Sequence, residues 1–486
     1  MYGGQFWIGL AWLTASVALL LLGISRVHEA AGIIGFLSLR AIVLIDSYLG
    51  LRRQNQASDV ATAWALILIL IGSQAWLLVP LINWTIVETY KIPASSMEPT
   101  LLGNVGDYHS KESCPFAAYH QVPWGDRIIV SKLAYVGSPI RRFEVAVFRF
   151  PLNQSKRFVK RVVGLPEEEL MLHAGDLFVR PKSGSVFEIV RKPMDVQDRI
   201  WIRMSDDPEV RGPIDDSQGN PVADVRVSFE VQADAAAAVF ARIVNRHGTF
   251  KLEFPKGQPG RLRHFSEGKE LKVFPLEAGM LMPGRWHAVE LMFFDGQVAA
   301  RLDSKILGPF PVVTSLDEAK GLSESPTNVS WSGRQDGLSV RGVRVDRDIH
   351  YRGRDNREFG LREDEGLKIP PGQYVCFGDN VANSHDSRAW VKRTFVLKDG
   401  RKVVCEAQQV NEAYSRFNRV LQDRLALPEP PLYAIDGDQQ GNEVAIVESE
   451  LLREEPAEAF RFVDRRFFVG RVVKIWWPLV REGPVR

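Results

Sequence analysis

The stretch RFVKRVVGLPEEEL, residues 157 to 170, carries the pattern that decides the fold. It begins with aromatic and β-branched residues and reaches Gly and Pro, which is typical of a strand followed by a turn. Because side chains alternate between the faces of a strand, Phe158, Lys160 and Val162 share one face. A lysine held among apolar neighbours has a lowered pKa and can exist as a free amine at neutral pH. A strand lysine more often extends to solvent, so both interpretations stay open.

The same strand signals recur along much of the chain, so the predicted fold class is mainly β. Short β-rich runs bounded by Gly, Pro or charged residues surround the first one, namely RIIVSKLAYV and EVAVFRF. A second β-rich stretch, about 185 to 350, contains VRVSFEVQA, AAVFARIVN, TFKLEF, WHAVELMFF, GQVAARLD and LSVRGVRVD. Their spacing and turn signals predict a β-sandwich. One soluble helix is predicted at about 406–425, where apolar residues recur at helical spacing.

The N-terminal part of the chain has the apolar runs of a membrane anchor. Residues 6–24 carry no charge and are about long enough to cross a bilayer, and 60–87 form a stronger span. Residues 31–45 contain a central arginine and form either a weak span or an interfacial helix. A cleaved signal peptide is the alternative for 6–24. Arg52 and Arg53 mark their loop as cytoplasmic, which places the chain after residue 88 outside the cytoplasm.

Composition excludes some classes of function. The chain has 486 residues and a formal net charge of +2, which gives no electrostatic argument for nucleic-acid binding. Its three cysteines, Cys114, Cys376 and Cys405, form no CxxC pattern, so a zinc site is not indicated. One disulfide between two of them remains open.

Two further stretches hold candidate chemistry. KIPASSMEPTLLG, residues 91 to 103, follows the last predicted span and presents Ser96 in a turn-prone apolar setting. CFGDNVANSHDSRAW, residues 376 to 390, is dense in polar side chains. A lone serine in a turn usually caps the backbone, and a polar loop usually satisfies its own backbone groups. A buried lysine amine could instead activate the serine hydroxyl, with the polar loop orienting that amine.

Together these stretches resemble the type I signal peptidase family. The family's blocks occur here in the family order, and the resemblance covers about residues 60 to 170, 371 to 392 and 466 to 478. The matching residues are Ser96, Met97, Pro99 and Thr100; Gly125 and Asp126; Lys160, Arg161, Gly164, Leu165 and Pro166; Gly378, Asp379, Asn380, Asn383, Ser384, Asp386, Ser387 and Arg388; and the run VGRVVKIWWP, 469 to 478.

The resemblance implies a membrane-bound serine endopeptidase that removes signal peptides from exported preproteins without a cofactor. Ser96 would be the nucleophile and Lys160 the general base, with Ser384 bonded to the lysine amine. The other implied site residues are Asp386 and Arg388 as an ion pair, Asp379 and Asn380 as supporting residues, and Ile92, Met97, Leu101 and Val159 around the substrate. The implied partners are signal peptides and the lipid bilayer of the cytoplasmic membrane, where the protein would be multi-pass with an extracytoplasmic catalytic domain.

Three positions depart from the family pattern. Ala94 stands where some members have a serine that completes the oxyanion hole, and where others have Gly. Glu167 replaces a turn glycine, which predicts a different turn after the strand of Lys160. Val391 replaces the glycine that usually follows the last aromatic residue of the polar block.

The predicted domains are a membrane anchor at 1–88, a catalytic domain in two parts at 89–184 and 351–486, and an insertion at 185–350. Within the insertion, PGRWHAVELMFFDGQVAARLD, residues 283 to 303, resembles concanavalin or laminin-G sandwiches. A glycan or protein ligand of the insertion stays open, because fold does not imply function. Trp286 and Trp331 are expected in the sandwich core, although they could stack on sugars.

Two rival functions remain. One is a catalytically silent, membrane-anchored β-sandwich that binds glycan or protein. The other is a hydrolase with a Ser/His/Asp triad that uses Asp107 with His109 or His120. The second is disfavoured because no Gly-x-Ser-x-Gly stretch surrounds any serine.

Overall fold

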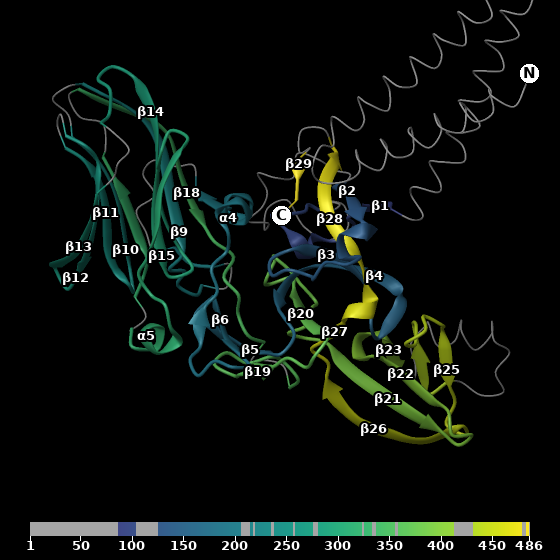
Figure 1. Ribbon diagram of the computed structural model, residues 1–486. Coiled ribbons are helices and arrows are strands. Elements are labelled where there is room, and N and C mark those ends of the chain that lie inside the picture. Colours follow the sequence, from purple (N-terminus) through teal and green to yellow (C-terminus); the bar gives the residue numbers. More distant parts are fainter. Residues whose placement is uncertain are drawn as a thin grey trace, which may run out of the picture. The chain divides into compact units, whose positions relative to one another are not determined.

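A computed structural model describes residues 86–485 except for gaps at 104–124, 206–213, 217–218, 235–237, 256–257, 276–279, 323–324, 333–336, 355–357, 413–430 and 479–482. The chain divides after Ile86 into two compact units, and the strands and helices discussed below all belong to the second (Figure 1). The predicted spans at 6–24 and 31–45 lie outside the described residues, as does 60–87 up to residue 85. Within the described ranges no helix is long and apolar enough to cross a membrane.

An eight-stranded sheet carries the candidate site, and strand β4 lies beside both β3 and β20 in it. In sheet order its strands are β1 (Val87–Lys91), β2 (Arg127–Ser131), β28 (Phe468–Trp477), β3 (Val145–Phe150), β4 (Asn153–Gly164), β20 (Gln373–Phe377) and β27 (Val463–Asp464), while β29 (Gly483–Pro484) pairs with β28. Because the run from Lys160 to Gly164 is buried, this end of β4 lies inside the molecule. The strand predicted from residues 157–164 therefore forms, with Lys160 facing inward.

The segment between β4 and β20 contains two sheets that enclose one hydrophobic core. One sheet has the order β13 (Lys269–Pro275), β12 (Arg261–Ser266), β11 (Gly248–Phe254), β10 (Val239–Asn245) and β17 (Asn328–Trp331). The other has the order β16 (Lys305–Pro311), β15 (Gln297–Leu302), β14 (Trp286–Phe294), β9 (Val225–Ala233), β18 (Leu338–Arg347) and β8 (Ile202–Ser205). Alternate residues of β9 are buried, and they join Phe250 and Leu252 of the facing sheet in one cluster.

Both ends of this two-sheet segment attach to one hairpin. Strands β5 (Glu168–His173) and β6 (Asp176–Pro181) form a small sheet with β7 (Glu188–Ile189) and β19 (Leu367–Lys368). At the outgoing end Ile189 of β7 pairs with Phe178, and at the returning end the Tyr351 N–H donates to the Gly175 carbonyl at 3.1 Å. The segment thus leaves and returns at the same place.

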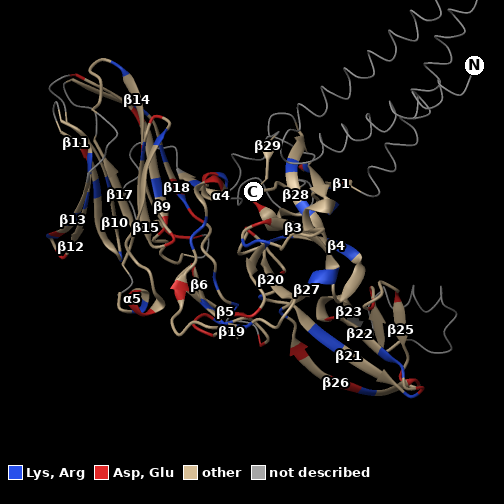
Figure 2. Ribbon diagram, in the orientation of Figure 1, with Lys and Arg blue, Asp and Glu red and all other residues tan. Residues whose placement is uncertain are grey.

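The remaining elements are short. Two three-stranded sheets follow the polar loop: β22 (Lys402–Glu406), β21 (Val391–Leu397) and β26 (Leu451–Ala459), then β23 (Val410–Glu412), β24 (Tyr433–Ile435) and β25 (Val444–Ile446). The described helices are α4 (Met194–Ile200) and α5 (Leu316–Lys320), with 3-10 turns η1 (Ser95–Met97), η3 (Lys132–Tyr135), η4 (Ala407–Gln409) and η5 (Arg465–Phe467). Acidic and basic residues are interspersed through the strands, in keeping with the near-neutral net charge (Figure 2).

The mainly β prediction is confirmed, and each of the six strands predicted between 185 and 350 has a counterpart in the structure. The predicted helix at 406–425 is wrong at its start, because η4 is a single turn and 410–412 pair with β24 as a strand. Residues 413–425 lie outside the described ranges.

The predicted positions of two tryptophans have different outcomes. Trp331 packs against the two-sheet core as expected. Trp286 is half-buried, and the Arg341 guanidinium lies over its ring at 4.0 Å from the ring centre. Cys376 and Cys405 are buried free thiols, and Cys114 is not described.

Candidate active site

The candidate nucleophile lies on a tight turn directly after an edge strand. Strand β1 ends at Lys91, and η1 places Ser96 between two buried residues. The turn is closed by backbone hydrogen bonds, since the Glu98 N–H donates to the Ser95 carbonyl at 3.0 Å and the Leu101 N–H donates to the Met97 carbonyl at 2.9 Å. Met97 and Leu101 are buried and fasten the turn to the sheet, while Ser96 stays half-buried. The hydroxyl is therefore held without being sealed inside.

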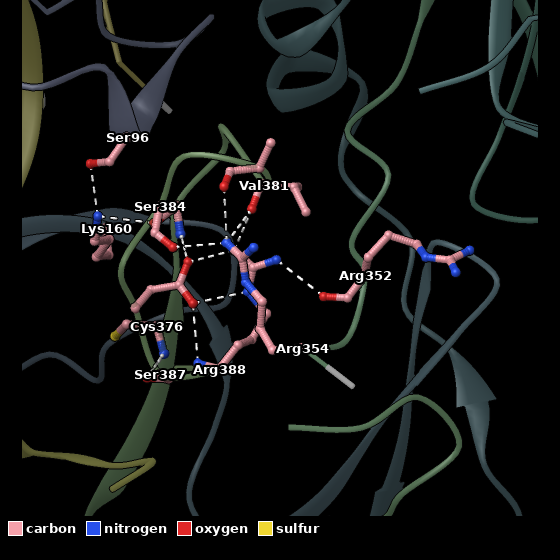
Figure 3. A network of polar contacts seen from close by, with 12 residues as sticks. Ser96, Lys160, Arg352, Arg354, Cys376, Val381, Ser384, Ser387 and Arg388 are labelled. Atoms are coloured by element: carbon pink, nitrogen blue, oxygen red, sulfur yellow. Dashed lines mark hydrogen bonds and ion pairs between the residues drawn. The ribbon is translucent and has the colours of Figure 1, made fainter. Parts of the chain in front are cut away.

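Lys160 contacts the two serines that the sequence pairs with it. Its Nζ donates to the Ser96 Oγ at 2.7 Å and to the Ser384 Oγ at 3.1 Å (Figure 3). The lysine is 4% exposed. Three residues from β4, from the turn after β1 and from the loop after β20 thus meet at one amine.

The surroundings of Lys160 favour a neutral amine. Burial lowers the pKa of Lys160 to about 8, although the nearby Asp386 carboxylate acts in the opposite direction. The Arg388 guanidinium adds to the lowering by repelling a second positive charge. A lysine with this pKa is partly deprotonated near neutral pH, which a general base requires.

The polar loop is held by a buried ion pair. The Arg388 Nε donates to the Asp386 Oδ1 at 2.9 Å, and the Gly378 N–H donates to the Asp386 Oδ2 at 2.8 Å. Burial alone would raise the pKa of Asp386, but Arg388 holds that pKa well below the usual range of a carboxyl group. Gly378 lets Ser384 and the backbone of Ser96 approach the polar loop closely. A Cβ at this position would lie 2.1 Å from the Ser384 Oγ and 2.4 Å from the Ser96 carbonyl oxygen.

A second buried ion pair joins Arg161 to Asp379. The Arg161 guanidinium donates to both Asp379 oxygens, at 2.8 and 2.6 Å, and also to the Thr100 hydroxyl at 3.0 Å. Asn380 donates through its backbone to the Ser96 carbonyl at 3.2 Å and through its side chain to the Ser95 carbonyl at 3.1 Å. The loop after β20 therefore holds the turn of Ser96 directly.

The predicted substrate contacts divide into two kinds. Ile92, Met97 and Leu101 are 4%, 1% and 0% exposed and belong to the hydrophobic core beneath the turn. Val159 is half-buried at the margin of that cluster. Three of the four side chains thus support the nucleophile turn in this structure.

The turn after β4 keeps a glycine-like backbone. Glu167 has φ of 64°, the left-handed region in which glycine is the usual residue. Its N–H donates to the Ile369 carbonyl at 3.0 Å. The expected change of turn geometry at this position is therefore not seen in the φ angle, since glutamate adopts a left-handed conformation itself.

An acidic cluster elsewhere meets the spacing of a metal site. Oxygens of Asp176, Asp224 and Asp295 lie within 4.8 Å of one another, all buried. The chain supplies its own cation there, because the Lys192 Nζ pairs with Asp295 and, at 2.9 Å, with Asp348. The cluster shares no residue with the contacts around Lys160 described above.

The structure brings together seven residues that the sequence singled out: Ser96, Lys160, Ser384, Asp379, Asn380, Asp386 and Arg388. Their roles in catalysis stay predictions. Sequence reasoning assigned no role to Arg161, which lies next to Lys160, nor to Arg354, which contacts the carbonyls of the Ser384 loop. Arg161 could have been suspected, since it stands beside Lys160 in the same block that matches the family. Arg354 gave no such signal. Asp107, His109 and His120 lie outside the described residues.

Comparison with known proteins places the chain near the signal peptidases. The family model described as signal peptidase, peptidase S26, matches residues 116–197 and 328–411, which contain Lys160 and Ser384 but not Ser96. Signal peptidase I of Pseudomonas fluorescens is 40% identical over 83 residues, 17% of this chain and 25% of that protein. Signal peptidase I of Rickettsia canadensis is 29% identical over 102 residues, 21% of this chain and 38% of that protein.

The resemblance to the signal peptidase family is thereby confirmed for these segments, and the two-part match is consistent with an insertion between them. The chain spans only about a quarter of the length of the Pseudomonas relative.

Two solved structures illustrate a weak resemblance in fold. The galectin LEC-6 of Caenorhabditis elegans is 11% identical, with a TM-score of 0.22, over 30% of this chain and 96% of that one. A SAP-like pentraxin of Limulus polyphemus is 14% identical, with a TM-score of 0.20, over 28% of this chain and 66% of that one. Scores this low support no conclusion about the inserted segment.

Proposed function

We propose that the chain is a membrane-associated serine endopeptidase that removes N-terminal signal peptides from exported preproteins by a Ser/Lys dyad. The 2.7 Å contact between the Lys160 Nζ and the Ser96 Oγ carries the proposal, because it joins a nucleophile to a base in one hydrogen bond. The family match supports the same activity. No cofactor takes part in the proposed reaction.

In the first half of the reaction the Ser96 Oγ attacks the carbonyl carbon of the scissile peptide bond. Its proton passes to the neutral Lys160 amine, and the carbonyl oxygen becomes an oxyanion. The Lys160 ammonium then gives the proton to the leaving nitrogen, so that the C–N bond breaks and the mature protein departs with a new N-terminus. An acyl ester on Ser96 remains.

In the second half a water molecule attacks the ester carbonyl. Lys160 takes a proton from this water and returns it to the Ser96 Oγ as the ester bond breaks, which releases the signal peptide with a free carboxylate. Ser384 holds the amine in line with Ser96 through both halves, since it contacts the same nitrogen from another side.

The Ser96 backbone N–H is the proposed donor to the oxyanion. Ala94 has no side-chain donor with which to supplement it, so the stabilisation rests more on the backbone and less on side-chain hydroxyls. This arrangement depends on the η1 turn, which Asn380 fastens from the side of the polar loop.

The proposed location is the cytoplasmic membrane, with the catalytic part outside the cytoplasm. The apolar runs predicted as spans precede the nucleophile turn in the chain. Basic residues favour the cytoplasmic side of a membrane, so Arg52 and Arg53 would lie in the cytoplasm and the site across the membrane from them. A substrate delivered in the bilayer would then meet Ser96 close to the membrane surface. The lipid bilayer is a partner in this proposal.

The proposed peptidase activity should rise with pH as the Lys160 ammonium loses a proton. Because burial lowers the pKa of Lys160 to about 8, kcat/KM is expected to increase through an apparent pKa near this value and below the ~10.4 of free lysine. The measurement is a pH profile of kcat/KM for cleavage of a preprotein in detergent. His109→Ala and His120→Ala variants should keep the same acid limb. An acid limb near ~6.5 that either substitution removes would favour the histidine hydrolase instead.

We also propose that residues 185–350 form a separate module. The contacts around Lys160 described above come from other parts of the chain, so replacing the module by a short Gly/Ser linker should preserve cleavage of a simple signal peptide. The melting temperature of this deletion variant should fall, because the deletion exposes apolar side chains in two clusters. Ile200, Ile202 and Ile349 pack in one core with Val163 and Phe377, and Ile189, Val313 and Leu316 pack against Met171 and Phe178. Loss of cleavage of every peptide by a variant that still folds would show that the module belongs to the catalytic part.

A further inference from the structure

The loop that carries Ser384 is gripped by an arginine from the segment that returns from the two-sheet insertion. The Arg354 Nη2 donates to the carbonyls of Val381 at 2.6 Å, Ala382 at 3.3 Å and Ser384 at 3.0 Å (Figure 3). One guanidinium nitrogen thus donates hydrogen bonds to three carbonyls within residues 381–384. Hydrogen bonds from a charged donor are stronger than those between neutral groups, so this contact fixes the turn firmly.

The returning segment is itself fixed to the same loop. The Arg354 N–H donates to the Leu361 carbonyl at 2.7 Å, and the Leu361 N–H donates to the Arg388 carbonyl at 2.9 Å. Gly360 approaches so closely that a Cβ there would lie 1.9 Å from the Arg354 carbonyl oxygen. In addition, the Arg388 Nη1 donates to the Arg352 carbonyl at 3.2 Å. The segment and the polar loop therefore form one bonded unit.

We propose that Arg354 is a positioning residue for the catalytic lysine, acting through Ser384. This inference rests on the proposed Ser/Lys mechanism. Arg354 holds the backbone of Ser384 from one side while the Ser384 hydroxyl contacts Lys160 on the other. The Ser384 Oγ lies 3.1 Å from the Lys160 amine. The loop must therefore keep its position for the amine to stay shielded from water and aligned with Ser96.

Removing the guanidinium should therefore change the chemistry of Lys160 and not only the stability of the fold. A loosened loop lets water reach the amine, and a hydrated lysine regains its ordinary pKa. The acid limb of the pH profile should then move upward from about 8. Misplacement of the base should lower kcat by about 10²-fold. KM should change little, because the described side-chain contacts of Arg354 are with the loop of Ser384 and not with the turn of Ser96.

The test is a pH profile of kcat and KM for the full-length enzyme in detergent, with a preprotein as substrate. Arg354→Ala should show the lower kcat and the raised acid limb. Arg354→Lys keeps a cationic donor without the planar fork, and it should fall between Arg354→Ala and the wild type in both quantities. Arg362→Ala is the matched control, since Arg362 is an exposed arginine of the same returning segment and should leave the profile unchanged.

The position of the acid limb does not depend on how much enzyme is folded, so a partly unfolded variant still gives an answer. An Arg354→Ala enzyme that is weaker only in amplitude, with its acid limb unmoved, would reduce Arg354 to a structural role and overturn the inference. Ser96→Ala and Lys160→Ala are run beside it. If those two retain activity, the dyad itself is wrong, and if they are inactive while Arg354→Ala behaves as wild type, only the role of Arg354 is lost.

Discussion

Ser96→Ala and Lys160→Ala are each expected to lower kcat/KM for signal-peptide cleavage by about 10⁴-fold or more, with the protein still folded. The effects should be equally severe, because nucleophile and base act as a unit and neither works without the other. The double variant should be no worse than either single one. The measurement is cleavage of a preprotein by each purified variant in detergent, with folding followed by circular dichroism.

Lys132→Ala and Lys156→Ala serve as matched controls. Their ammonium groups are partly exposed and pair with Glu88 and Asp436, so neither contacts Ser96. Both variants should retain nearly the wild-type rate. A Lys160→Ala enzyme with near-normal turnover would rule out the dyad, and a wild-type protein that cleaves no preprotein would favour the catalytically silent, anchored sandwich.

Lys192→Met is expected to destabilise the protein by about 3–5 kcal/mol, which is the cost of leaving buried charge without its partner. Lys192 is 5% exposed and pairs with Asp295 and Asp348, beside Asp224 and Asp176. Its removal leaves those carboxylates facing one another in a medium that solvates them poorly. The loss is measured as the change in the free energy of unfolding by urea, with Lys182→Met, on the exposed surface, as the control with little effect.

The size of this loss should depend on pH. Burial, with the nearby Asp348 and Asp176 carboxylates, raises the pKa of Asp295 to about 7. An acid whose folded pKa exceeds its unfolded value stabilises the fold when protonated, and this stabilisation disappears as pH rises from about 4 to about 7. Lys192 acts to lower the pKa of Asp295, so its removal should raise that pKa further. The variant's carboxyl then stays protonated at pH values where the wild-type carboxyl is charged, so the Lys192→Met protein should be nearer to wild type at pH 5 than at pH 8. A deficit that is equal at both values would mean that the carboxyl groups do not titrate with folding.

Much of the two-sheet segment could be predicted from the sequence because its strands bury alternate residues. In β9 the buried set falls at every second position from Val225 to Ala233, and the period-2 pattern shows this directly. Strands β8, β12, β13, β16 and β17 were not predicted. In β13 most residues are exposed, and without one buried face a strand has no apolar alternation to detect.

The candidate site could be predicted to the extent that its residues form recognisable blocks. Ser96, Lys160 and Ser384 stood out for this reason. Arg354 could not, because its partners are backbone carbonyls, which any sequence provides. The helix expected at 406–425 failed at its start because apolar residues at helical spacing do not exclude a strand that pairs with β24.

The place where the two-sheet segment leaves and returns has a consequence for the order of folding. Lys160 and Ser384 are separated by 224 positions and Arg161 and Asp379 by 218, so the site closes a very long loop, and loop-closure entropy opposes this contact. Once the segment has folded, the Gly175 and Tyr351 backbones lie one hydrogen bond apart, and the remaining loop is short. Pairing of β4 with β20 should therefore follow folding of the segment, and a nascent chain that has exposed Ser96 and Lys160 but not yet Ser384 should have no assembled site with which to cleave the wrong peptide.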